Sequence, residues 1–151
     1  MKKKLKTVKE ITEKLLKHLG IEAKVELVEG QEEEIQVNLD SPDQGVLIGY
    51  HGRALASFQW VLAMIAYRHL GEWTRILVDV GDYRQRRQEQ LEAIAFNTAK
   101  RVKFSGEACA LPYLSSAERR IIHLALAEND EVVTESEGEG RERKVVVKPK
   151  E

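Results

Sequence analysis

Apolar residues in the first eighty positions follow first a helical and then a strand-like spacing. They recur every three or four residues from Val8 onward, which predicts an amphipathic helix over about residues 6–19, ended by Gly20. Apolar and polar residues then alternate over about residues 21–28 and again over 35–39, with a glycine and an acidic run between them. This pattern predicts two antiparallel strands joined as a hairpin.

Two helices with a very short connection are expected next. Ser41 and Gln44, in the run Ser-Pro-Asp-Gln, match a capping box at a helix start. That helix is short, because the segment Gly-Tyr-His-Gly at 49–52 follows it closely. A second helix continues to Gly71, and alternation over 76–80 predicts a third strand. The predicted order is therefore α-β-β-α-α-β.

A second unit is expected to begin near Gly81. Asp82 can cap a long helix with a regular apolar stripe, and a short strand candidate follows at 107–111. Ser115 and Glu118 form a second capping box, for a helix through about Ala127, and two strand candidates lie beyond it. We therefore expect an α+β chain of two small domains, residues 1–80 and 81–151.

Composition narrows the class of protein. The 151 residues are 42% hydrophobic and 32% charged, a balance typical of soluble globular domains. No apolar run approaches the roughly 20 residues that a membrane span needs, and no apolar stretch follows the basic start as in a secretory signal. The only cysteine, Cys109, excludes an intramolecular disulfide and a multi-cysteine zinc site. A cytoplasmic location and no metal are expected.

Charge is local rather than global. The formal net charge is −1, which by itself does not indicate a nucleic-acid-binding protein. Basic residues nevertheless cluster near the N-terminus, over 84–87 and over 100–103, while acidic residues gather around 32–34 and 135–139. Each run is also compatible with an ordinary solvated surface. A role in binding nucleic acid must therefore be argued from particular sites.

The junction of the two helices in the first unit is one such site. Glycines at 49 and 52 allow a sharp turn and the close approach of another backbone. The amides of Gly52, Arg53 and Ala54 would lie at the N-terminus of the next helix, where unsatisfied donors attract phosphate. An ordinary turn between helices would have the same short spacing.

The segment from Val46 to Leu55 resembles the core of a KH domain with the type II order of elements. In that family the G-x-x-G loop clamps the backbone of about four single-stranded nucleotides. The resemblance implies that Gly49, Tyr50, His51 and Gly52 form the clamp. The family often has Lys or Arg between the glycines, whereas this chain has Tyr and His, so Arg53 would supply the charge and Tyr50 would stack on a base or ribose.

A second candidate site lies on the predicted helix after Ser115. Arg119 and His123 are four residues apart and share a face. We assign the opposite face to the core, with Ala117, Ile121, Leu124 and Ala125 as its buried residues. His123 would then point away from the core, although the flanking Ile122 and Leu126 would allow it to be half-buried beneath a loop. A purely structural role for the pair is the alternative.

The stretch from Ser116 to Leu126, followed by Gly-containing and basic segments, resembles the R-three-H domain. That domain is named for its Arg-x-x-x-His pair and is associated with single-stranded nucleic acid. The resemblance implies that Arg119 and His123 bind phosphate, which suits the guanidinium fork and the imidazole donor. Four further basic residues would widen the positive surface: Arg120, Lys100, Arg101 and Arg143.

A KH domain followed directly by an R-three-H domain is similar to the bacterial Jag (SpoIIIJ-associated) family. Members often carry a further N-terminal domain, whereas the basic start of this sequence leads directly into the first KH helix. The resemblance implies binding of single-stranded RNA, post-transcriptional regulation linked to cell elongation or division, and a small single-KH partner protein. Single-stranded DNA binding, or a protein-interaction role of a degenerate KH fold, are the alternatives.

Catalytic motifs are absent from the sequence. It contains no phosphate-binding G-x-x-x-x-G-K-S/T loop, no H-E-x-x-H and no G-x-S-x-G. Cys109 lies among alanines in a strand candidate and is interpreted as a buried, inert thiol. Trp60 and Trp73 are interpreted as core or domain-contact residues rather than base-stacking platforms. We expect no enzyme activity, no cofactor and no small-molecule substrate.

Overall fold

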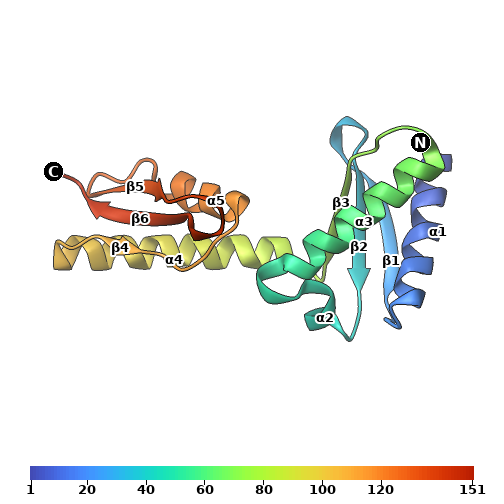
Figure 1. The fold of residues 1–151 in the computed structure, drawn as a ribbon, viewed down its shortest axis with the longest axis horizontal. Helices are drawn as coiled ribbons and strands as arrows, with labels where there is room; N and C mark the ends of the chain where they lie inside the picture. Colours follow the sequence, from blue (N-terminus) through green and yellow to red (C-terminus); the bar gives the residue numbers. More distant parts are fainter. The chain divides into compact units, whose positions relative to one another are not determined.

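The computed structural model describes residues 1–151, which divide into two compact units, Met1–Arg84 and Gln85–Glu151. The first unit has the predicted order of helices and strands (Figure 1). Its elements are α1 (Lys2–His18), β1 (Lys24–Glu29), β2 (Ile35–Asp40), α2 (Gln44–Ile48), α3 (Arg53–Leu70) and β3 (Ile76–Val80). The α-β-β-α-α-β prediction is therefore confirmed.

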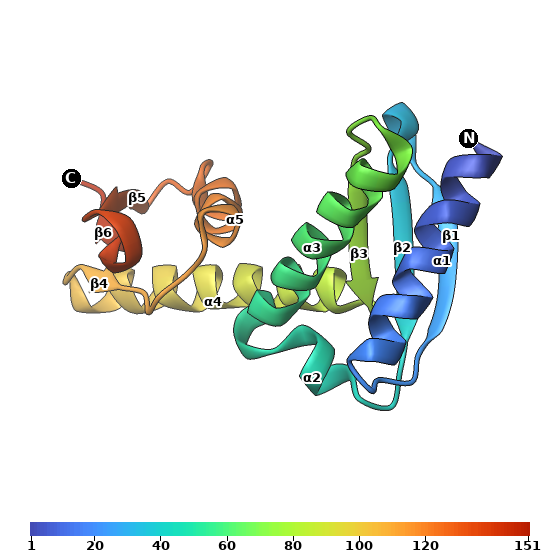
Figure 2. The same ribbon diagram turned by 45° about the vertical axis from the view of Figure 1, so that its right-hand side comes forward.

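The sheet of the first unit has the strand order β1-β2-β3. Strands β1 and β2 pair antiparallel as a hairpin, and β2 pairs with β3 in parallel. Parallel neighbours need a crossover connection, and α2 and α3 provide it. Helices α1 and α3 cover the same face of this sheet (Figure 2). The junction between α2 and α3 thus lies within the crossover.

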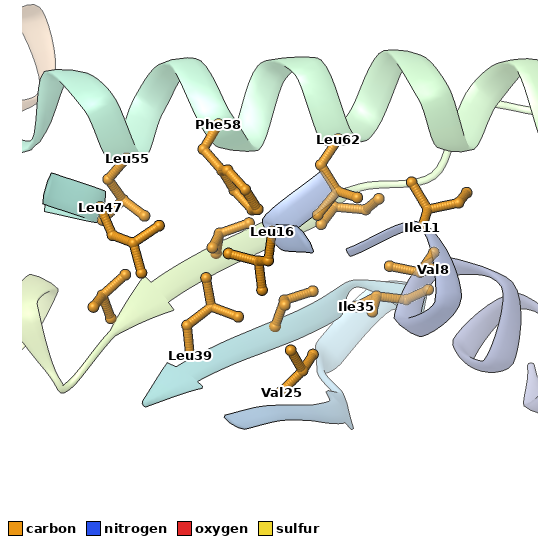
Figure 3. Packing of buried hydrophobic residues seen from close by; sticks show 14 of the residues in the cluster. Val8, Ile11, Leu16, Val25, Ile35, Leu39, Leu47, Leu55, Phe58 and Leu62 are labelled. Carbon is orange, nitrogen blue, oxygen red and sulfur yellow. The ribbon is translucent and has the colours of Figure 1, made fainter. Parts of the chain in front are cut away.

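Alternation along the strands determines which face of the sheet is buried. Ile35, Val37 and Leu39 of β2 are at most 2% exposed and belong to the core of this unit. Figure 3 shows Ile35 and Leu39 beneath α3, with Leu62 of that helix pointing toward the sheet. Full burial of each such side chain contributes about 1.5–3 kcal/mol. The intervening residues point to the opposite face, which no helix of this unit covers.

The start of α2 differs from the prediction. The hydroxyl of Ser41 is buried, donates to the carbonyl of Glu22 and accepts the amide of Asp43 at 3.1 Å, instead of capping Gln44. The helix begins only at Gln44, with Asp43 as its N-cap residue. The predicted capping box is therefore wrong, because the helix begins later than expected and the hydroxyl of Ser41 bonds to Glu22 and to the amide of Asp43 instead.

The second unit is a three-stranded antiparallel sheet packed with two helices. Its elements are α4 (Tyr83–Ser105, which starts within the first unit), β4 (Cys109–Ala110), α5 (Ser116–Leu126), β5 (Val132–Glu137) and β6 (Lys144–Pro149). The strand order is β4-β6-β5. The cap of α4 also differs from the prediction, because the amide of Arg84 donates to the Asp79 carboxylate at 3.2 Å. Asp82 instead adopts a left-handed conformation, with φ of 57°.

Helix α5 begins as predicted but buries a different face. Ser115 and Glu118 form the expected capping box. The fully buried positions are Ile122 and Leu126, whereas Leu124 is 65% exposed. Ala117 is exposed too, and the partly buried Ile121 and Ala125 only flank the core. The predicted core face is thus wrong by about one residue, or roughly 100° around the helix.

Candidate nucleic-acid interface

Gly49 occupies a conformation and a space that only glycine can occupy. Its φ of 68° and ψ of −165° lie in a region essentially restricted to glycine. A Cβ atom at this position would lie 2.6 Å from the Cβ of Ala54 and 3.0 Å from the backbone nitrogen of that residue. The absence of a side chain therefore allows the turn to fold directly onto the first turn of α3.

The other end of the turn is also left-handed, but its neighbour is a side chain rather than backbone. Gly52 has a φ of 80°, and a Cβ there would lie 2.9 Å from the ring of Tyr83. His51 between the glycines is also left-handed, with φ of 51°. Three of the four residues in this turn thus have positive φ, and the side chains of Tyr50 and His51 are exposed to solvent.

The exposed side chains at the turn are organised by contacts with one another. The rings of Tyr50 and His51 stack at 4.0 Å with only 14° between their planes. The guanidinium carbon of Arg53 lies 5.5 Å from the centroid of the Tyr50 ring, within cation–π range. The amide of Arg53 donates to the carbonyl of Tyr50, so this amide is directed into the turn, contrary to the prediction. The turn presents stacked rings and a cation next to the uncapped N-terminus of α3.

In the second unit, Arg119 reaches back over the start of α5. Its Nη1 donates to the carbonyl of Leu114 at 2.9 Å, and its Nη2 donates to the hydroxyl of Ser116 at 3.1 Å. The side chain is half-buried and held in one orientation by these bonds. A guanidinium carries five donor hydrogens, so two internal bonds leave further donor capacity for an anion.

His123 is half-buried against β5 rather than beneath a loop. Its Nδ1 lies 2.6 Å from the hydroxyl of Thr134, and its Nε2 lies 2.8 Å from that of Ser136. Partial burial lowers the pKa of His123 below its ordinary value, and the charges of Arg119 and Arg143 lower it further. The ring is therefore neutral at pH 7 and bonded on both sides.

The remaining basic candidates lie in three different settings. Arg143 lies close enough to His123 to lower its pKa and donates to the carbonyl of Gly138 at 3.2 Å. Arg101 instead donates to the sulfur of the partly buried Cys109 in β4, at the edge of the sheet opposite β5. Arg120 and Lys100 are exposed on α5 and α4. The structure thus gathers Arg119, His123 and Arg143, and places Arg101 elsewhere.

Three polar residues near the second site were not identified from the sequence as part of it. The hydroxyls of Ser116, Thr134 and Ser136 surround the arginine and histidine. Thr134 and Ser136 are two residues apart on a strand and so share a face, a spacing visible in the sequence.

Trp60 and Trp73 are 59% and 57% exposed, so the core prediction for them is wrong. No helix of the structure is long and apolar enough to cross a membrane.

Comparison with protein families matches both halves of the chain. Residues 6–79 match the family described as KhpA/KhpB, KH domain, and residues 89–149 match the R-three-H domain. A curated protein from Clostridium symbiosum named RNA-binding protein KhpB is 37% identical over 130 residues, 86% of this chain and 58% of that protein. Its namesake from Lactiplantibacillus plantarum is 36% identical over 133 residues, 88% of this chain and 41% of that protein.

A more distant namesake from Bacillus subtilis is 28% identical over 125 residues, 82% of this chain and 60% of that protein. The chain thus spans about half the length of the curated relatives it matches. Both domain matches occur in the order that the fold shows, with the G-x-x-G turn inside one and the Arg-x-x-x-His pair inside the other. The chain therefore belongs to the Jag (KhpB) family of tandem KH and R-three-H domain proteins.

Proposed function

We propose that this chain binds single-stranded RNA through two modules, a KH domain at residues 1–80 and an R-three-H domain at residues 81–151. The observation that carries the proposal is the exposed Gly49–Gly52 turn, whose left-handed backbone presents stacked rings and a guanidinium at a helix N-terminus. The curated relatives are named as RNA-binding proteins, which supports the same ligand.

The clamp comprises Gly49, Tyr50, His51, Gly52 and Arg53. In the second module Arg119 and Arg143 hold a phosphate, and His123 joins them by exchanging one of its two hydroxyl contacts, to Thr134 or Ser136, for the phosphate. Arg120, Lys100 and Arg101 add to the positive surface. Each module binds weakly by itself, and the covalent link raises the effective concentration of the second contact. We further propose a cytoplasmic, non-catalytic role in post-transcriptional regulation connected with cell elongation or division, with a small single-KH protein as partner.

One feature favours the alternative in which the first unit mediates protein contact. A largely apolar groove of about 350 Å³ lies between α1, α2 and α3. Val46 on its rim is 66% exposed, and Leu19 is 54% exposed. A single-KH partner or a second copy of this chain would bury these side chains. RNA binding at the turn and protein contact at this groove use different residues and are compatible.

The test is a filter-binding titration of RNA and DNA oligonucleotides at two salt concentrations. The double variant Tyr50→Asp/His51→Asp places two negative charges at the clamp. At low salt we expect about a tenfold loss of RNA affinity or more, because a like charge about 4 Å from a phosphate costs about 1 kcal/mol in water. Binding by the unaltered chain must itself weaken with salt, since phosphate contacts release counterions.

The matched control is Gln31→Asp/Asn38→Asp, which adds the same charge at two exposed positions of the same unit. Helix content measured by circular dichroism should be unchanged in both double variants. Equal losses of affinity in the two variants would mean that only net charge matters and would remove the turn from the mechanism. Tight binding of DNA together with weak binding of RNA would favour the DNA alternative.

A further inference from the structure

Three large aromatic side chains gather on the surface of the first unit. Trp60 and Tyr67 lie on α3, and Trp73 follows its end; they are 59%, 47% and 57% exposed. The ring of Trp73 lies 5.9 Å from that of Trp60 and 6.1 Å from that of Tyr67, tilted by 56° and 52°. Burial of such rings is strongly favourable, so a cluster of three left in solvent marks a binding surface.

The cluster is continuous with the glycine turn along one face of α3. Arg53, Trp60 and Tyr67 are spaced by seven residues, which is close to two helical turns, so their side chains share a face. Seven residues correspond to a rise of about 10 Å. Met64, 42% exposed, lies on the same face between the two rings. An exposed stripe therefore leads from the guanidinium beside the turn to the aromatic cluster.

The charge of α3 indicates what kind of molecule covers this stripe. Its 18 residues include Arg53, Arg68 and His69 and no acidic residue. The helix itself therefore does not repel a polyanion, and the acidic residue next to Trp73, Glu72, is paired with Lys4 at 3.1 Å. Exposed aromatic rings also provide flat surfaces on which bases stack irrespective of sequence. Cationic and aromatic side chains on an acid-free helix suit a single-stranded nucleic acid better than a protein partner.

We propose that Trp60, Tyr67 and Trp73 form a stacking platform for the bases of a single RNA strand whose backbone is held at the Gly49–Gly52 turn. This inference rests on the function proposed above and extends it. A strand of about four nucleotides fills the clamp alone. A longer strand continues along α3 and places unpaired bases on the three rings. The platform thus lengthens the binding site of the first unit and adds affinity without base preference.

Tryptophan emission reads this site directly, because Trp60 and Trp73 are the only two tryptophans in the chain. The full chain is titrated with oligoadenylates of four and twelve nucleotides, and both emission and affinity are recorded. We expect the twelve-mer to quench the emission. The Trp73→Leu variant retains Trp60 as sole emitter, and that emission should still respond to the twelve-mer.

The Trp60→Leu variant keeps an apolar side chain but removes the ring. Since stacking on an aromatic ring contributes measurably per base, affinity for the twelve-mer should fall at least fivefold, while the four-mer is unaffected. Phe104→Leu is the matched control, because this ring is 87% exposed on α4 and lies outside the stripe. The replaced side chains are exposed, so circular dichroism spectra and melting temperatures should match those of the unaltered chain.

The outcomes separate this inference from the proposed function. Tight binding of the twelve-mer with unchanged emission, and equal affinity in Trp60→Leu, would overturn the platform and leave RNA binding intact. Failure of the unaltered chain to bind either oligonucleotide would overturn both. Sedimentation equilibrium gives the third result: self-association that Trp60→Leu abolishes would assign the cluster to protein contact and overturn the platform.

Discussion

Replacement of Arg119 by alanine separates a structural from a binding role in the second unit. The side chain donates to the Leu114 carbonyl at 2.9 Å and to the Ser116 hydroxyl at 3.1 Å. A hydrogen bond contributes about 0.5–1.5 kcal/mol net, and the second of these is exposed, so we expect Arg119→Ala to lose about 1–2.5 kcal/mol of stability. In a domain of 60–100 residues each kcal/mol shifts the Tm by about 4–8 °C. Calorimetry should therefore record a fall of about 4–20 °C.

The same variant should also change the salt dependence of RNA binding. For single strands, the slope of log K against log salt concentration changes by about 0.7 for each phosphate contact. If the guanidinium of Arg119 contacts one phosphate while keeping its internal bonds, Arg119→Ala lowers affinity for every sequence and reduces the slope by about 0.7. Fluorescence anisotropy at four salt concentrations, well below the lowered Tm, measures this quantity on folded protein.

Ser116→Ala is the matched control for Arg119→Ala. It removes one of the two internal hydrogen bonds and leaves the charge in place, so it should lower the Tm slightly and leave the salt slope unchanged. The binding role of Arg119 is refuted if Arg119→Ala lowers the Tm while its salt slope equals that of Ser116→Ala. The guanidinium would then only bridge the loop and the helix start.

Three further perturbations test other parts of the structure. Glu118→Ala removes the carboxylate that Arg87 contacts at 2.7 Å in a largely buried ion pair, so urea unfolding should show that the free energy of unfolding falls by about 3–5 kcal/mol. If the double variant Arg87→Ala/Glu118→Ala loses the full sum of the two single losses, the residues are not coupled. Gly49→Ala should lower the free energy of unfolding by about 1–3 kcal/mol from backbone strain, and by more from crowding against Ala54. Gly45→Ala has open space around its Cβ position and should be nearly neutral. Equal losses in the two variants would show that the turn is not constrained. Folding lowers the pKa of His123, so its contribution to stability is complete above about pH 6.5 and is lost as the pH falls through the folded pKa. A bound phosphate favours the charged ring, so RNA affinity should rise as the pH falls over the same range. Profiles of stability and of RNA affinity against pH that match those of His123→Asn would exclude both effects.

The first unit was predictable because its patterns are local. Alternation over residues 35–39 gives the buried face of β2 directly, since a strand has only two faces. Glycines at 49 and 52 predict a sharp turn from sequence alone, and both have the positive φ that such a turn requires. What the pattern does not contain is the orientation of each amide. The Arg53 amide turns inward because a short 3-10 turn precedes α3.

The buried face of α5 was not predictable, because apolar residues occur on nearly all sides of this short helix. Ile121, Ile122 and Leu124 point in three directions, so periodicity alone does not select one. The choice is made by a contact distant in sequence. Glu118 caps the helix and pairs with Arg87, which lies 31 residues earlier on α4, and this pair places Ile122 inward.

The difference of about 100° between the predicted and the observed buried face of α5 also explains which residues His123 contacts. With Ile122 inward, His123 meets the inner face of β5, which Thr134 and Ser136 share with the buried Val132. Its two ring nitrogens lie within hydrogen-bond distance of the hydroxyls of Thr134 and Ser136. Helical spacing correctly places Arg119 and His123 on one face but says nothing about strands that fold against that face. Sequence reasoning therefore identifies the candidate residues, whereas their hydrogen-bond partners require the tertiary structure.

A net charge of −1 is compatible with RNA binding because the charges of the first unit are segregated. The uncovered face of its sheet carries Glu26, Asp40 and Asp79, and the one lysine there, Lys24, is paired with Glu26 at 2.8 Å. On the other side of the sheet, α3 has no acidic residue. The thickness of a helix, about 10 Å, is close to the Debye length at 0.1 M salt, so the acidic face is largely screened from a strand lying along the outer side of α3. The sheet face repels a polyanion and α3 accepts one, so the distribution of charge in the first unit, rather than its sum, orients the strand.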